Sequence, residues 1–312
     1  MEQADGRLRF SVVVPAYNEA AYVGATLKAL QHQDFAGPYE IIIVDNNSTD
    51  GTAAIAASYG VTVVSEPVVG VCQARQCGAA HARGEILVST DADTVQPPDW
   101  LSRIDRQFRR GDDVVAVGGP CRFSNPSWWA GFFPQLLFRM VAAVFSWTGR
   151  VFYISATNTA VRRSDFPGYN PLMTQGGDEL DLLRRLKPAG RVVWDPDNVV
   201  LTSSRRLQQG LFYSFFVSFL TFYVVAYLVN RLSSRPLLGM APAFRQERHQ
   251  RIRRWRGGRL RSSLGKIGHQ ARTGISWGVG LRLALIATAS VGIIRLAVPA
   301  AAHEFSRRWG TP

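Results

Sequence analysis

Two aspartates stand two residues apart directly after a short apolar run. Asp91 and Asp93 follow Ile86, Leu87 and Val88, which have the character of a buried strand. Two carboxylates at this spacing in a tight turn can approach one hard cation, and Mg²⁺ and Mn²⁺ prefer oxygen ligands together with substrate phosphates. An isolated Asp-x-Asp pair is most often a solvated turn, so the rest of the sequence must decide between these two interpretations.

A second pair of acids, Asp178 and Glu179, opens a helical pattern that runs to residue 186. A carboxylate placed beside an attacking hydroxyl can serve as its general base. The alternative is structural, because acidic side chains also stabilise the first turn of a helix through the helix dipole. Both roles are compatible with one sequence, and the cation-binding pattern at Asp91 and Asp93 favours catalysis.

The elements that must position these acids alternate between short apolar runs and helical patterns. Strands are predicted near 10–14, 41–44, 61–64, 86–89 and 114–117, and helices over 20–31 and 52–58. This alternation is typical of βαβ units, which build a mainly parallel sheet with helices on both faces, so the predicted fold class is α/β. Ligands of such sheets bind beyond the carboxyl ends of the strands, where the polar clusters at 15–19, 45–51 and 90–94 are expected.

Composition and charge divide the 312-residue chain into two regions. With 46% hydrophobic and 19% charged residues the chain can bury a full core, which excludes disordered, collagen-like and small disulfide-rich proteins. Residues 1–206 hold 20 Lys or Arg against 21 Asp or Glu, whereas residues 207–312 hold 16 against 2. We therefore predict a catalytic domain over 1–206 and a basic, helical, membrane-associated region over 207–312. Three cysteines and the lack of a secretory leader favour the cytoplasm for the catalytic domain.

The second region has the features of a membrane-associated segment. Residues 211–229 carry no charge and are long enough to cross a bilayer, whereas 275–302 is interrupted by two arginines. Between them, 230–274 carry a net charge of +11, which favours an anionic membrane surface over nucleic acid because few aromatic residues are interleaved.

A crossing by 211–229 would place this basic loop opposite the cytoplasm, against the positive-inside rule. We therefore expect 211–229 to be re-entrant or interfacial, with 275–302 either joining it or making the only crossing. The protein is expected at the cytoplasmic face of the cell membrane. A further helical pattern at 128–147 fits either a core helix or a helix lying in a membrane surface.

Four segments, 12–19, 43–52, 75–84 and 91–93, resemble the motifs of inverting family 2 glycosyltransferases in their order and spacing. The resemblance implies a GT-A fold with a Rossmann-like nucleotide-binding sheet and a nucleotide-diphosphate sugar as donor. It also implies a divalent metal, Mg²⁺ or Mn²⁺, between the donor phosphates and the Asp-x-Asp turn. The implied nucleotide-binding residues are Ala16, Tyr17, Glu19, Asp45, Arg75 and Asp91, and the implied metal ligands are Asp93 and Asp91.

Two later segments are similar to the family's acceptor side. Residues 176–186 resemble an acidic segment, which implies Glu179 as the base that deprotonates the acceptor hydroxyl and Asp178 as the alternative base. Residues 154–163 resemble the segment that lines the donor sugar and the acceptor site, and this implies substrate-binding roles for Thr157 and Asn158.

The chain departs from the family pattern at two places. The family often has a second Asp after the position of Asp45, where this chain has Asn46, which keeps an acceptor and loses a charge. The Gln-x-x-Arg-Trp motif of processive members is absent at 202–206, which indicates that one sugar is added per acceptor.

The sequence thus predicts a metal-dependent inverting glycosyltransferase that transfers a sugar to a hydroxyl of a lipid-associated acceptor. One alternative is transfer to a polyprenyl phosphate, which is already ionised and needs no base. Another is an inactive membrane-attached protein that binds sugar nucleotides, against which the intact Asp91 and Asp93 argue.

Overall fold

A computed structural model of the chain describes residues 7–124, 128–170 and 178–205. The predicted domain boundary at residue 206 and the apolar segments 211–229 and 275–302 lie outside the described residues, so these expectations remain predictions. Among the helices of the described residues, none combines the length and apolar character that a membrane crossing requires. The three cysteines are free thiols.

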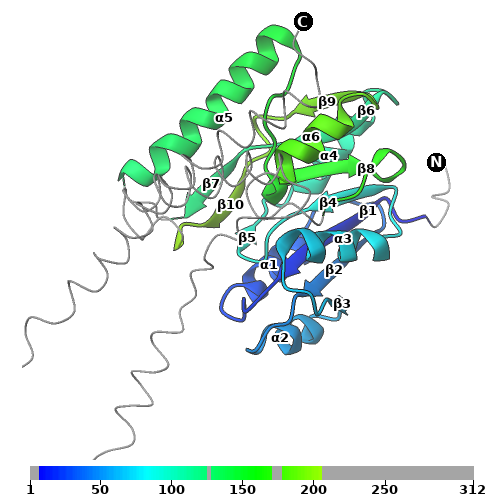
Figure 1. Ribbon diagram of the computed structural model, residues 1–312, viewed down its shortest axis with the longest axis vertical. Coiled ribbons are helices and arrows are strands. Elements are labelled where there is room, and N and C mark those ends of the chain that lie inside the picture. The colour runs from blue at the N-terminus through cyan, green and yellow to red at the C-terminus, as the bar shows by residue number, and fades with distance from the viewer. Residues whose placement is uncertain (1–6, 125–127, 171–177, 206–312) are drawn as a thin grey trace, which may run out of the picture. The chain divides into compact units, whose positions relative to one another are not determined.

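A seven-stranded sheet forms the centre of the described domain (Figure 1). Its spatial order is β3-β2-β1-β4-β8-β6-β9, and β8 runs antiparallel to both of its neighbours while the other pairs of this sheet are parallel. The predicted mainly parallel α/β sheet is therefore confirmed. The strands are β1 (Phe10–Ala16), β2 (Tyr39–Asp45), β3 (Thr62–Ser65), β4 (Ile86–Ser89), β6 (Val114–Gly118), β8 (Thr159–Arg162) and β9 (Arg191–Trp194).

A smaller three-stranded sheet has the order β5-β10-β7. It contains β5 (Thr94–Val95), β7 (Cys121–Ser124) and β10 (Val200–Ser203). Because β5 begins directly after the Asp-x-Asp turn and pairs with β10, this sheet ties that turn to the last described residues of the chain.

Helices cover both faces of the large sheet. Val12 and Val14 of β1 belong to a core cluster shared with α1 and α4, whereas Val13 belongs to a second cluster shared with α3. Helix α3 packs so closely that a Cβ added at Gly78 would lie 2.3 Å from a methyl carbon of Val13, which only glycine avoids. The helices are α1 (Val23–Gln31), α2 (Thr52–Ser58), α3 (Val71–His81), α4 (Trp100–Phe108), α5 (Trp128–Thr148) and α6 (Asp178–Leu186), with single turns η1 (Ala156–Asn158) and η2 (Arg163–Asp165).

Helix α5 has one buried and one exposed apolar face. Phe138 and Val141 are buried, and Phe138 stacks on Trp194 of β9 with ring centroids 5.8 Å apart. The opposite face exposes apolar side chains at helical spacing, namely Leu136, Met140, Val144 and Trp147, with Trp147 88% exposed. The helix predicted at 128–147 is therefore present; one of its faces packs in the core, and the other exposes apolar side chains.

Candidate active site

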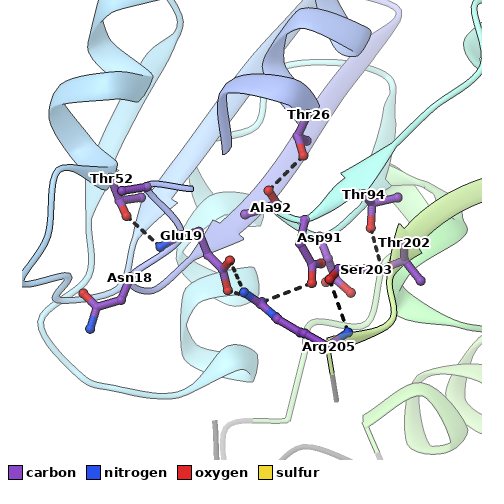
Figure 2. A network of polar contacts seen from close by, with 12 residues as sticks. Asn18, Glu19, Thr26, Thr52, Asp91, Ala92, Thr94, Thr202, Ser203 and Arg205 are labelled. Carbon is purple, nitrogen blue, oxygen red and sulfur yellow. Dashed lines mark hydrogen bonds and ion pairs between the residues drawn. The ribbon is translucent and has the colours of Figure 1, made fainter. Parts of the chain in front are cut away.

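The loops that follow β1 and β2 are joined by hydrogen bonds at the carboxyl edge of the sheet. The Asn18 amide donates to Ser48 Oγ at 2.9 Å, and the Thr49 amide donates to Asn18 Oδ1 at 2.6 Å. The Glu19 amide donates to Thr52 Oγ1 at 2.7 Å (Figure 2). Asn18 has a φ of 53°, a left-handed conformation that asparagine adopts more readily than most residues. These contacts fix the backbone of Glu19 where a parallel sheet binds its ligands.

The predicted nucleotide residues Ala16, Tyr17 and Asp45 lie around this edge. Ala16 is buried in the core, and its carbonyl accepts the Asn46 amide at 2.8 Å, which joins the ends of β1 and β2. Tyr17 and Asp45 are half-buried. The Oδ1 atom of Asp45 is buried and accepts no hydrogen bond from the described residues, which leaves an acceptor for a donor group of a ligand.

Asn46 holds a neighbouring loop. Its Nδ2 donates to the carbonyls of Glu66 and Val68 at 2.9 and 2.7 Å, and its Oδ1 accepts the Gly70 amide at 2.7 Å. A carboxylate could not make the two donations. From the sequence, Asn46 differed from the family's Asp only by a lost charge. In the structure its amide N–H groups also hold the backbone of the 66–70 loop, which an Asp could not do.

Arg75 connects the two acidic motifs. Its guanidinium lies 2.9 Å from Asp91 Oδ1 and 2.7 Å from Asp178 Oδ2, and the residue is 5% exposed. Thr157 donates to the other carboxylate oxygen of Asp91 at 2.7 Å. Burial by itself would lower the pKa of Arg75, but the charges of Asp91 and Asp178 outweigh burial and raise it. Arg75 is therefore a permanent cation between the predicted metal turn and the predicted base.

The acid pair occupies the first turn of α6. Asp178 is buried against Arg75, and Glu179 is half-buried beside it. Burial, and then the neighbouring Asp178, raise the pKa of Glu179 well above its ordinary value. A carboxyl group with a raised pKa is better matched to accept a proton near neutral pH than an ordinary glutamate.

The predicted acceptor residues separate into two environments. Thr157 faces Asp91, as described above, and so belongs to the site. Asn158 is buried below it: its Oδ1 accepts the Trp100 indole N–H at 2.8 Å, and its Nδ2 donates to the carbonyls of Asn198 and Pro120 at 2.6 and 3.1 Å. These three bonds hold the Asn158 amide against the scaffold, and the substrate-binding role expected for this residue stays a prediction.

Two residues that sequence reasoning did not select complete the cluster. Arg205 makes a bidentate contact with Glu19, with Nη1 2.6 Å from Oε2 (Figure 2). Its Nη2 lies 3.1 Å from Asp93 Oδ2. Tyr169 is buried near Arg75, and burial raises the pKa of its hydroxyl to about 12. Arg205 belongs to the polar run at 202–206. In the sequence this run showed only that the processive motif is absent, so nothing there indicated a role for Arg205.

The oxygen ligands present fit a divalent cation that is shared with a substrate. Within the described parts of the chain, no cluster of three His, Cys, Asp or Glu side chains could hold a metal. Mg²⁺ typically uses one or two carboxylates and completes its shell with phosphate oxygens and water. Asp91 is bonded to Arg75 and Thr157, and Asp93 Oδ2 lies 3.1 Å from Arg205 Nη2, so an arginine contacts each of the two carboxylates. The site therefore suits a cation bound together with a diphosphate.

Comparison with known proteins identifies the class. The sequence profile described as glycosyl transferase family 2 matches residues 11–168, half of the chain, and the chain belongs to this family. Solved structures with the same GT-A fold include the mannosyltransferase PcManGT of Pyrobaculum calidifontis in complex with GDP-Man and Mn²⁺. It is 26% identical, with a TM-score of 0.50 over 63% of this chain and 57% of that one. Glucosyl-3-phosphoglycerate synthase of Mycobacterium tuberculosis, 21% identical, has a TM-score of 0.53 over 72% of this chain and 78% of that one.

Curated relatives match a shorter stretch. Glycosyltransferase AglE of Haloferax volcanii is 32% identical over 124 residues, which are 38% of this chain and 40% of the relative. Undecaprenyl-phosphate 4-deoxy-4-formamido-L-arabinose transferase of Aeromonas hydrophila is 32% identical over 116 residues, 34% of this chain and 36% of the relative. The chain thus spans well under half the length of these two relatives. It is a member of glycosyl transferase family 2 with a GT-A fold.

Proposed function

We propose that this glycosyltransferase is metal-dependent and inverting, and that it moves one sugar from a nucleotide-diphosphate sugar to a hydroxyl of a lipid-associated acceptor. The observation that carries the proposal is the bridge by Arg75 from Asp91 to Asp178. The same guanidinium contacts the Asp-x-Asp turn, which is suited to the donor's metal, and the acidic start of α6, which is suited to supply the acceptor's base.

The donor half of the proposal rests on the carboxyl edge of the sheet. The unfilled acceptor at Asp45 Oδ1 is suited to a base or ribose donor group. A divalent cation at Asp93, with Asp91 beside it, would supply positive charge that stabilises the departing diphosphate. Arg75 orients Asp91, because it contacts one carboxylate oxygen while Thr157 contacts the other.

The acceptor half assigns the proton transfer to Glu179. In a single displacement the acceptor oxygen bonds to the anomeric carbon as the bond to the diphosphate oxygen breaks, and the hydroxyl proton passes to a carboxylate. Asp178 is already hydrogen-bonded to Arg75, so its role is to hold that guanidinium. Glu179, whose pKa is raised by burial and by Asp178, is the group suited to take the proton.

A second candidate function is transfer to a polyprenyl phosphate. The relative from Aeromonas hydrophila acts, by its name, on undecaprenyl phosphate, which favours this alternative. A phosphate acceptor is ionised at neutral pH, so transfer to it would not depend on Glu179. Activity that survives Glu179→Gln on a polyprenyl phosphate acceptor would establish this alternative over the hydroxyl acceptor.

The proposal includes a location at the cytoplasmic face of the cell membrane, on an anionic surface. The exposed stripe of α5 supports it, because Leu136, Met140, Val144 and Trp147 present apolar surface along one helix face. The basic region beyond residue 206 adds the charge that attracts anionic lipid.

The test is a transfer assay with purified protein in detergent. A panel of UDP-, GDP- and dTDP-sugars is incubated with Mn²⁺ and a lipid extract, and labelled lipid is separated from free sugar. Metal-dependent labelling that disappears in Asp93→Ala supports the proposal. Nucleotide-sugar binding with neither transfer nor metal-dependent hydrolysis for any donor would instead establish an inactive binding protein.

A further inference from the structure

Arg205 is the last described residue before the C-terminal region, and its side chain points back into the site. The guanidinium lies between Glu19 and Asp93 and stacks over Tyr22 at 4.9 Å from the ring centroid. Its side chain is only 16% exposed. An arginine held by two carboxylates and an aromatic face is a built contact rather than a solvated surface charge.

The backbone fixes Arg205 relative to the Asp-x-Asp turn. The Ser203 amide donates to the carbonyl of Asp93 at 3.1 Å. Thr94 Oγ1 donates to Thr202 Oγ1 at 3.2 Å (Figure 2). Antiparallel pairing of β5 with β10 places Thr202 opposite Thr94. Arg205 follows β10, and β10 pairs with β5, the strand that begins directly after the Asp-x-Asp turn, so this pairing brings the guanidinium to Asp93.

Arg205 and a divalent cation would compete for the carboxylate of Asp93. Each is stabilised by the same carboxylate, and each repels the other at contact distance. A donor diphosphate changes this balance, because a guanidinium fork binds phosphate oxygens as well as it binds a carboxylate. Arg205 contacts Glu19 and Asp93 at the edge of the sheet where that diphosphate is expected.

We propose that Arg205 exchanges its contact with Asp93 for the donor diphosphate, so that the divalent cation and the nucleotide are bound cooperatively. Without a nucleotide the arginine weakens cation binding, and with a nucleotide it strengthens the complex. This inference rests on the proposed function, because it takes Asp93 as the metal ligand. It makes Arg205 a donor-binding residue that couples nucleotide binding to cation binding at Asp93.

The test measures Mn²⁺ binding to the full-length protein in detergent by electron paramagnetic resonance, without nucleotide and with UDP or GDP. Arg205→Gln is expected to bind Mn²⁺ about tenfold more tightly than the wild type without nucleotide, the order of one charge-assisted hydrogen bond. With Mn²⁺ present, the same variant is expected to bind the nucleotide about tenfold more weakly. Arg205→Lys keeps the charge without the fork and should shift both affinities about threefold in the same directions.

The matched control is Arg191→Gln, which breaks an ion pair with Asp113 on an exposed part of the domain and should leave both affinities unchanged. Unchanged or weaker Mn²⁺ binding without nucleotide in Arg205→Gln would overturn the inference, and so would unchanged nucleotide affinity. If Arg205→Gln does not fold, Arg205→Lys decides by the same criteria. Asp93→Asn distinguishes failure of the metal assignment from failure of the exchange by Arg205. If Asp93→Asn keeps the wild-type affinity for Mn²⁺, the metal assignment itself fails. If Asp93→Asn loses Mn²⁺ binding but Arg205→Gln changes neither affinity, only the exchange is refuted.

Discussion

Replacing Asn46 by aspartate tests whether this departure from the family pattern is structural. The side chain is 3% exposed, and its two amide hydrogens serve the carbonyls of Glu66 and Val68. Asn46→Asp removes both donations and turns a carboxylate oxygen toward two carbonyl oxygens. Two lost hydrogen bonds at about 1 kcal/mol each, plus the penalty for a buried and poorly paired charge, predict a loss of about 3–5 kcal/mol.

The loss should depend on pH in a defined direction. Only a protonated carboxyl can donate to either carbonyl, so the pKa of the introduced acid is raised in the folded state above about 3.9, the value for an unfolded aspartate. As pH rises above about 4, the unfolded chain releases this proton first, and the free energy of unfolding falls. The variant should therefore be closest to the wild type near pH 4–5 and furthest from it at pH 8.

Thermal unfolding followed at pH 5 and pH 8 measures both effects. At about 2–4 °C per kcal/mol for a domain of this size, the melting temperature should fall by about 10 °C at pH 8 and by less at pH 5. Asn47→Asp is the matched control, since the same chemical change falls on the next residue, which is exposed, and should cost less than about 0.5 kcal/mol. A stable Asn46→Asp protein, or a deficit that does not change with pH, would refute the structural reading of this residue.

Three other predictions address the site and the surface. Asp93→Ala should remove the enhancement of nucleotide binding by Mn²⁺, measured by calorimetry, and an unchanged affinity would contradict the metal assignment. Glu179→Gln should lower kcat on a hydroxyl acceptor by about 10²–10⁴, and Asp178→Asn should lower it by less. Because the base acts when it is ionised, the wild-type rate should rise with pH through the raised pKa of Glu179. An inactive Asp178→Asn together with an active Glu179→Gln would exchange the two roles. Met140→Ser with Val144→Ser should weaken co-sedimentation with anionic vesicles without changing the melting temperature, and equal binding would exclude the α5 stripe as a membrane contact.

The sequence by itself determined the local features of this protein. Each apolar run and its following polar cluster can be interpreted from a few consecutive residues, because strand burial and turn chemistry are local. The strands at 10–14, 41–44, 86–89 and 114–117, the Asp-x-Asp turn and the acidic start of α6 were therefore all predicted where the structure has them. The antiparallel strand β8 was not predicted, since its place between β4 and β6 depends on pairing with distant residues.

Tertiary structure decided which of these groups meet. Arg75 and Asp178 are separated by 103 residues and Glu19 and Arg205 by 186, and no periodicity in the chain encodes either contact. The three hydrogen bonds that Asn158 makes with the scaffold also join it to distant residues, and they could not be inferred from the segment around it. Ion pairs and buried hydrogen bonds form between elements that packing brings together. The acids and Arg75 could therefore be selected from the sequence, whereas the carboxylates that Arg75 and Arg205 contact could be found only from the fold.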